Sequence, residues 1–500
     1  MGKVRHLSLV IFFTVFAASC ISVPPEGNVP KLGSHIALTT FDSSNSIYRI
    51  WYVSYSADIY TLLGIVDDDE GWSAIPGAAT YLDRGNFGGD AVAYGVSAFT
   101  STYESAIGAT SYEYGYLAGT DGKVYEVRFS EDYIFARWRT GEIPGDTASA
   151  PLAAVGFQDY PTDTMEYKIA AVAKGGMPEG YLYHFSEIIK EIDGEWGEDE
   201  DYKMPAMEKI DGIENVDQTA SIASATLEPV PGIDGEPAYF LVRDSSTGEF
   251  VVARKRSSGF QVEILPLMPP SPGIQVGTAV SAVGIGNEES GRIHVFATDI
   301  GGCLYHLIMK PDLAIDQFWL PLSLRCNFST RRASISSDVS YHPPPDAPGD
   351  GEPVIVASAV RLDDLGIESD VAIFRISSED PYLMDSYDLS PYPREVSAFY
   401  GGVLTRNLFN PTTSLDRNLT FTITAMGETG RMRPLFLNET TPLHVGGETR
   451  VWKDLGIGHA RGLEATGISL PHNELFLAEY DGTNRRYQGR IVAASIVRDN

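Results

Sequence analysis

The sequence predicts an all-β fold made of one unit repeated along the chain, and three observations support this prediction. An aromatic residue recurs at nearly constant intervals, a second aromatic residue precedes it, and a turn sequence lies just upstream of that second residue. Self-similarity at a fixed period is typical of repeat architectures. The first set is spaced by 58 to 68 residues and comprises Trp72, Trp138, Trp196, Phe260, Trp319, Tyr387 and Trp452.

The second aromatic residue indicates a hairpin in every unit. Just before it comes a turn sequence rich in Asp and Gly, as in Ala118-Gly-Thr-Asp-Gly-Lys-Val-Tyr125. Asp hydrogen-bonds its own backbone in such turns, and Gly accepts a positive φ. The flanking runs are β-rich, as in Arg292-Ile-His-Val-Phe-Ala297, so both are expected to be strands. The second set lies 10 to 16 residues before the first, at Tyr60, Tyr125, Tyr183, Phe250, Tyr305, Phe374 and Phe436.

A strand rich in small residues precedes each hairpin, and the aromatic residue of the first set begins a short fourth strand. Small side chains are needed where several strands crowd around one axis. Four strands per unit with a small-residue inner strand are the signature of β-propeller blades. The clearest inner strands are Ala148–Gly156, Ala220–Ala225, Gly277–Gly284 and Ala333–Ser337.

The count of units favours an eight-bladed β-propeller, with seven blades as the alternative. Seven complete units run from residue 35 to about residue 457, and Leu463–Ile468, Glu474–Glu479 and Arg490–Val497 match the first three strands of an eighth. The ring could close with a strand borrowed from residues 21–33, although the prolines there make a poor strand. Residues 34–500 are therefore expected to form a single propeller domain.

The N-terminus has the layout of an export signal, predicted to span residues 1–19. Basic residues are followed by an apolar run too short to cross a bilayer, and small residues then lead to Cys20. The run Ala17-Ala-Ser-Cys20 resembles the bacterial lipobox, in which the cysteine is acylated. Residues 20–33 would then be an anchor or linker, and the protein would be exported and held at the cell envelope or outer surface by its lipid. If Cys20 is not acylated, the protein is secreted.

The two remaining cysteines form an even pair, Cys303 and Cys326, in the fifth unit. In an exported protein such a pair is a candidate disulfide, and two buried free thiols are the alternative.

The charge of the chain excludes some partners. The formal net charge is −30 at pH 7, which repels nucleic acid and anionic lipid headgroups. We therefore expect contact with the membrane only through the lipid anchor. The acidic clusters, including Asp67–Glu70, lack the spacing of a calcium loop and are interpreted as solvated loop charge.

Long insertions are expected on one face of the disc. Each is rich in Pro, Gly or Asp and lies between a first and a second strand, a connection that always leaves a propeller on the same side. Binding residues concentrate in such loops on a rigid scaffold. The insertions are residues 157–166, 228–236, 286–291, 342–352 and 404–417.

The sequence contains no catalytic motif that we recognise, such as H-E-x-x-H, G-x-S-x-G, a phosphate-binding loop or C-x-x-C. We therefore predict no catalytic residue, metal ligand or cofactor, and expect a binding protein rather than an enzyme. His184 and His306 occupy the same Leu-Tyr-His position of their units, which indicates a structural role.

Two units resemble the repeats of tectonin-type and fucose-binding propeller lectins. These are the run ending in Tyr125, followed by Trp138, and Asp299-Ile-Gly-Gly-Cys-Leu-Tyr305, followed by Trp319. In that family a hairpin of this kind is paired with a downstream tryptophan, and sugars bind between blades. The resemblance implies that Trp138 and Trp319 are candidates for stacking against a ligand, whereas packing between neighbouring blades is the simpler interpretation and the one that we favour.

The sequence thus predicts a monomeric, non-catalytic binding module that recognises glycans or an envelope protein partner. One alternative is a scaffold subunit of an envelope complex. Another is a propeller glycoside hydrolase or lyase that uses carboxylates near the central channel.

Overall fold

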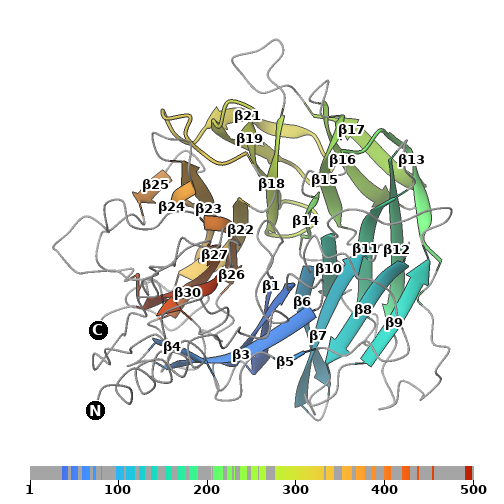
Figure 1. Cartoon of the computed structure of the whole chain (residues 1–500). Coiled ribbons are helices and arrows are strands. Elements are labelled where there is room, and N and C mark those ends of the chain that lie inside the picture. Colours follow the sequence, from blue (N-terminus) through green and yellow to red (C-terminus); the bar gives the residue numbers. More distant parts are fainter. Residues whose placement is uncertain are drawn as a thin grey trace, which may run out of the picture.

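The all-β prediction is confirmed by the computed structural model (Figure 1). Residues 1–36, which include the predicted signal peptide, Cys20 and the anchor segment, lie outside the described part. The described residues are 37–42, 47–53, 59–67, 71–74, 80–81, 97–105, 108–118, 123–129, 137–142, 153–158, 167–175, 180–189, 204, 206–217, 222–227, 230, 237–244, 249–256, 258–265, 276–330, 334–342, 352–362, 368–377, 384–388, 399–406, 419–427, 436–437, 453–454 and 490–497.

The first three sheets follow one another along the chain. The first contains β1 (Ala37–Asp42), β2 (Ile47–Val53), β3 (Ile59–Asp67) and β4 (Gly71–Ala74), with β5 (Thr80–Tyr81) also paired to β3. The second contains β6 (Ser97–Ser105), β7 (Gly108–Ala118), β8 (Lys123–Phe129) and β9 (Arg137–Glu142). The third contains β10 (Ala153–Gln158), β11 (Tyr167–Gly175), β12 (Tyr181–Ile189) and β13 (Glu208–Glu214).

The next three sheets repeat this antiparallel order. The fourth contains β14 (Ile222–Ala225), β15 (Ala238–Asp244), β16 (Glu249–Arg256) and β17 (Gly259–Ile264). The fifth contains β18 (Val276–Ile285), β19 (Arg292–Asp299), β20 (Leu304–Met309) and β21 (Ile315–Pro321). The sixth contains β22 (Ile335–His342), β23 (Glu352–Leu362), β24 (Glu368–Ser377) and β25 (Met384–Asp388).

The seventh sheet has a different order. Its strands are β26 (Phe399–Arg406), β27 (Leu419–Gly427), β30 (Arg490–Val497) and β28 (Phe436–Leu437), and β29 (Lys453–Asp454) also pairs with β30. The sequence had suggested that residues 490–497 belong to an eighth blade, but the structure places them in the third position of the seventh sheet. An eight-residue strand forms a longer ladder with β27 than residues 436–437 can, and ladder hydrogen bonds accumulate with length. The described strands form seven sheets, so the eight-blade count is not confirmed.

The sheets are arranged as a ring with their first strands at the centre (Figure 1). Each inner strand contacts the inner strand of the next sheet, from β1 through β6, β10, β14, β18 and β22 to β26, and β26 contacts β1. This arrangement of radial four-stranded sheets around a common axis is a β-propeller.

Aromatic and apolar side chains fill the space between neighbouring sheets. The second aromatic set lies on third strands in the first six sheets, as predicted, and Tyr125, Phe250 and Phe374 are buried. Glycine permits close approach at some of these contacts. The indole of the buried Trp51 on β2 lies 2.6 Å from the position that a Cβ on Gly115 would occupy. The cores between the sheets therefore hold the ring together.

The first aromatic set lies on the fourth strand in five sheets, at Trp72, Trp138, Phe260, Trp319 and Tyr387. The third sheet departs from the prediction, because its fourth strand is β13, downstream of Trp196, which lies outside the described residues. Trp452 also lies outside them, directly before β29. In β13 the positive φ of Gly212 interrupts the alternation, so that Ile210 and Ile213 are both buried. This irregular spacing hides the strand from a search for period-two patterns.

Candidate functional site

The five predicted insertions each lie between a first and a second strand, and of the insertions themselves only residues 286–291 are described throughout. They connect β10 to β11, β14 to β15, β18 to β19, β22 to β23 and β26 to β27, which are first and second strands in every case. Because strand direction alternates, the turns between third and fourth strands emerge on the same side. We call this side the loop-bearing face, and the interface between its fourth and fifth sheets carries a buried ion pair and several side-chain hydrogen bonds.

The connection over residues 286–291 is a compact loop that closes on itself. Gly286 has a φ of 76°, which glycine adopts without strain. The Asn287 side-chain oxygen accepts hydrogen bonds from the backbone N–H of Glu289 and of Ser290, both at 3.0 Å. The Gly291 N–H donates to the Asn287 carbonyl at 2.7 Å. These bonds fix the loop so that Glu288 is directed into the protein, where it is buried.

Glu288 forms an ion pair with Arg254 of the neighbouring sheet. The Arg254 guanidinium donates from Nη2 to Glu288 Oε1 and from Nη1 to the Pro311 carbonyl, and both side chains of the pair are almost fully buried. Arg256 Nη2 donates to the same carbonyl at 2.8 Å. The end of β16 thereby holds two connections of the fifth sheet, the 286–291 loop and the β20–β21 turn.

Burial is the main influence on the pKa of Glu288 in this pair. It raises the pKa of the Glu288 carboxyl from its ordinary value, while the charge and hydrogen bond of Arg254 oppose the rise. Glu288 Oε2 is buried and accepts no hydrogen bond from the part of the chain that the structure describes. Since neither charged group reaches solvent, the pair positions the loops around it and is not itself a contact surface for a ligand.

A rim of more accessible polar groups surrounds the buried pair. Arg256 Nε donates to Gln261 Oε1 at 3.2 Å, and Gln261 Nε2 lies 3.4 Å from the Asp312 carbonyl of the next sheet. On the fifth sheet Arg292 Nε donates to Asp316 Oδ2 at 2.5 Å. We call Arg256, Gln261, Arg292, Asp312 and Asp316 the polar rim. Guanidinium, amide and carboxylate groups side by side supply both donors and acceptors, which is what hydroxyl-rich ligands require.

Trp319, a candidate for ligand stacking, is buried at 2% exposure. Its ring packs against Phe250 of the fourth sheet, with centroids 5.9 Å apart. The indole fills the core between two sheets, in line with packing between neighbouring blades, which is the interpretation that the sequence favoured. Alternation along β21 leaves Phe318, with 51% exposure, as the accessible aromatic residue there. Trp138 lies on β9, and its side chain is outside the description.

The two Leu-Tyr-His units place their histidines alike, buried on third strands. His184 on β12 packs edge-on against Tyr239 and Phe260 of the fourth sheet. His306 on β20 stacks on Phe296, and its Nε2 lies 2.9 Å from Nδ1 of His294, which is also buried. Burial lowers the pKa of His306 to about 3, and burial with the nearby His306 and Arg292 lowers that of His294 well below its ordinary value.

This histidine pair predicts a loss of stability in mild acid. Below pH ~6.5 the unfolded chain binds two protons that the folded pair does not, so the free energy of unfolding should fall by about 1.4 kcal/mol per pH unit for each histidine. Above that pH both states are neutral and the pair has no effect. Urea unfolding between pH 5 and 7.5 measures how the free energy of unfolding depends on pH. The variant His306→Gln should reduce this slope by about 1.4 kcal/mol per pH unit, which corresponds to one proton. An unchanged slope in that variant would refute the assignment.

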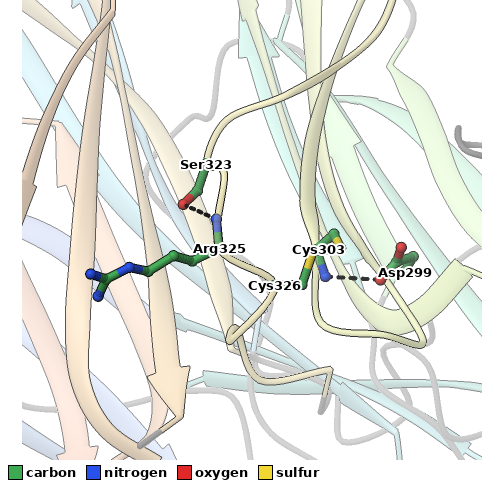
Figure 2. Close-up of a disulfide and its surroundings, with 5 residues drawn as sticks. All are labelled: Asp299, Cys303, Ser323, Arg325 and Cys326. Atoms are coloured by element: carbon green, nitrogen blue, oxygen red, sulfur yellow. Dashed lines mark hydrogen bonds between the residues drawn. A yellow bond between two sulfur atoms is a disulfide. The ribbon is translucent and has the colours of Figure 1, made fainter.

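The structure joins Cys303 and Cys326 in a disulfide (Figure 2). Cys303 lies in the β19–β20 turn and Cys326 follows β21, so the bond is on the opposite side of the ring from the loop-bearing face. The Cys303 N–H donates to Asp299 Oδ1 at 2.8 Å. Among the described residues, no group of three or more His, Cys, Asp or Glu side chains is placed to hold a metal ion. Within the same residues, no helix has the length and apolar character needed to cross a membrane.

Comparisons with protein-family models and with curated proteins give no match. Among solved structures, the chain is similar to the BP39L lectin from Burkholderia pseudomallei, with 15% identity, a TM-score of 0.46, and coverage of 79% of this chain and 93% of that one. It is also similar to the fucose-specific lectin from Aleuria aurantia, with 12% identity, a TM-score of 0.40 and coverage of 72% and 96%. An intramolecular trans-sialidase from Ruminococcus gnavus is similar too, with 11% identity, a TM-score of 0.38 and coverage of 81% and 90%. Similarity at this level carries no information about a ligand, and the propeller assignment rests on the sheet topology itself.

Proposed function

We propose that this protein is a non-catalytic propeller module that binds glycans at the polar rim on its loop-bearing face. The observation that supports this proposal is that polar groups of two neighbouring sheets come together there, since the Arg256 and Gln261 side chains donate to the backbone carbonyls of Pro311 and Asp312. Arg256 and Gln261 come from the fourth sheet, and Arg292, Asp312 and Asp316 come from the fifth. Sugar hydroxyls both donate and accept, so a surface of mixed donors and acceptors fits them better than a surface of one kind.

The buried pair of Arg254 and Glu288 supports the same proposal. It fixes the 286–291 loop and the β20–β21 turn against the end of β16, so the rim groups are held on rigid elements. A preorganised site avoids the entropic cost of ordering side chains and loops on binding. The polar rim is therefore suited to weak ligands such as single sugar residues.

The cellular location of the protein is a further part of the proposal. We infer export and acylation of Cys20 from the signal-like N-terminus and the lipobox-like Ala17-Ala-Ser-Cys20. An anchored module would keep its binding face close to the envelope. Incorporation of labelled palmitate that is abolished by Cys20→Ser is the expected result, and equal incorporation in both chains would exclude this part.

Binding to a glycan array tests the function. We expect the full chain to bind at least one class of sugar, and the variant carrying Arg256→Ala and Gln261→Ala to lose about tenfold or more in affinity, because hydrogen bonds to charged groups contribute about 1.5–3 kcal/mol. Lys209→Ala is the matched control, since Lys209 lies on an outer strand, β13, of a different sheet. Absence of binding to every sugar, or equal loss in the control, would contradict the proposal and direct attention to a protein partner.

A further inference from the structure

Residues 322–330, which we call the linker, leave β21 and lead toward β22, and their backbone is bonded to two sheets. On the fifth sheet, the Leu322 N–H donates to the Leu304 carbonyl and the Phe328 N–H to the Gly302 carbonyl, both at 2.9 Å. On the sixth, the Ser329 N–H donates to the Val360 carbonyl at 2.8 Å. The Leu362 N–H donates to the Asn327 carbonyl at 2.6 Å. The linker therefore ties the fifth sheet to the sixth.

Phe328 is the linker residue that lies in the core between the fifth and sixth sheets. Its side chain is 0% exposed and belongs to the apolar cluster between the two sheets. Its ring centroid lies 5.9 Å from that of Phe374 on β24. A residue from a connection, and not from a strand, thus completes this interface. Any change that lets the linker leave its position would remove an aromatic ring from the core.

The disulfide attaches the linker to the fifth sheet two residues before Phe328. Cys303 is half-buried in the β19–β20 turn, whereas Cys326 is exposed. The neighbouring Leu324 is fully exposed, and the Arg325 side chain extends away from the bond (Figure 2). Access to a sulfur atom is one of the factors that govern the rate of thiol–disulfide exchange. The Cys326 sulfur is the more accessible of the two to a thiol from outside.

We propose that the Cys303–Cys326 bond is a redox-sensitive clamp that keeps the linker, and with it Phe328, in the interface between the fifth and sixth sheets. The reductant is a dithiol, either a small molecule or a dithiol oxidoreductase. Its thiolate attacks the Cys326 sulfur, the bond between the cysteines breaks, and Cys303 leaves as a thiolate that takes up a proton. The second thiolate of the reductant then releases Cys326. The reductant gives up two electrons and becomes a disulfide.

Release of the clamp affects one part of the ring. The linker hydrogen bonds and Phe328 are then held by non-covalent contacts only, so local opening becomes more frequent. The interface between the fourth and fifth sheets, on the loop-bearing face, makes none of its described contacts through the linker. The inference is therefore independent of the proposed glycan binding.

Hydrogen exchange on the full chain tests the clamp. In the oxidised protein the amides of Phe328, Ser329 and Leu362 should exchange slowly. Millimolar dithiothreitol under native conditions should reduce the bond, as shown by alkylation and mass spectrometry, and speed exchange at these amides by tenfold or more. Amides of β7 and β8 in the second sheet, which is not a neighbour of the fifth, are the internal control and should not change.

Two outcomes would overturn the inference. A bond that resists dithiothreitol until the protein unfolds is not accessible, and a bond that is reduced with no change in exchange does not hold the linker. The variant with Cys303→Ser and Cys326→Ser should show fast exchange without reductant. If that variant does not fold, the time course of the reduced natural chain still decides the question.

Discussion

Replacing Gly284 with alanine is expected to lower the free energy of unfolding by about 3 kcal/mol or more, through overpacking between two inner strands. Gly284 lies on β18, and a Cβ placed there would lie 1.9 Å from the backbone oxygen of Thr226 and 2.8 Å from its carbonyl carbon. Thr226 directly follows the inner strand of the fourth sheet, β14. Backbone atoms cannot rotate away, so the inner strands themselves must separate. Chemical denaturation of the two chains measures the difference.

Gly141→Ala is the matched control for this prediction. Gly141 also lies in a strand, β9, but the atoms nearest to the position that its Cβ would occupy belong to the side chain of Met204, at 3.2 Å or more. The nearest of these atoms, the Met204 Cβ, needs to shift by only a few tenths of an ångström, and the Sδ and Cε at 3.5 and 3.7 Å belong to a flexible side chain, so this variant should change stability by less than about 1 kcal/mol. Equal effects of the two substitutions would show that the close approach of inner strands does not limit the side chain at Gly284.

The second large effect is expected at the buried ion pair. Glu288→Ala should cost about 3–5 kcal/mol, because it leaves the Arg254 guanidinium buried without this carboxylate. Both side chains of the pair are 1% exposed, and the charge of Arg254 is almost fully removed from water. The combined change Arg254→Met and Glu288→Leu should recover much of that loss, since apolar groups of similar size often replace a buried pair at little cost. Urea unfolding of the three chains gives the comparison.

A neighbouring ion pair supplies the control. Arg292 and Asp316 are joined at 2.5 Å, but their side chains are 37% and 35% exposed. Solvent screens such a pair, so Asp316→Ala should cost about 1 kcal/mol or less. If Glu288→Ala were no more destabilising than Asp316→Ala, burial of the first pair could not be what fixes the loop-bearing face.

Much of the fold could be predicted because its repeats are local. The Asp-Gly turns, the aromatic residues on third strands and the small residues of inner strands each follow from the chemistry of a short stretch. The strands β8, β16 and β20 accordingly lie at the predicted positions of Tyr125, Phe250 and Tyr305. The insertions also fall where expected, because the position of a loop between two recognised strands is itself local information.

Features that depend on contacts between distant segments could not be predicted from the sequence. Residues 490–497 have the pattern of a strand, but nothing local says which sheet they join, and the structure pairs them with β27. The choice between the two interpretations of Trp319 also depends on distant segments, since a tryptophan on an outer strand can face solvent or the next sheet. Phe318 and Trp319 are adjacent, and only the register of β21 decides which one is buried.

The candidate site could be predicted only as a face of the molecule. The sequence indicated that the long connections share one side of the disc, which follows from alternating strand direction. It did not indicate Arg254 or Glu288, because these residues lie 34 positions apart and meet only when two sheets pack side by side.

The sequence by itself determined that this protein is a ring of repeated β-sheets, because strand, turn and repeat period are encoded in short, regular patterns. Only the tertiary structure decided which side chains meet between the sheets. It buries Trp319 against Phe250, pairs Arg254 with Glu288, and seats Phe328 beside the Cys303–Cys326 bond. The physical reason is that burial and pairing depend on the packing of whole sheets, which no single repeat contains.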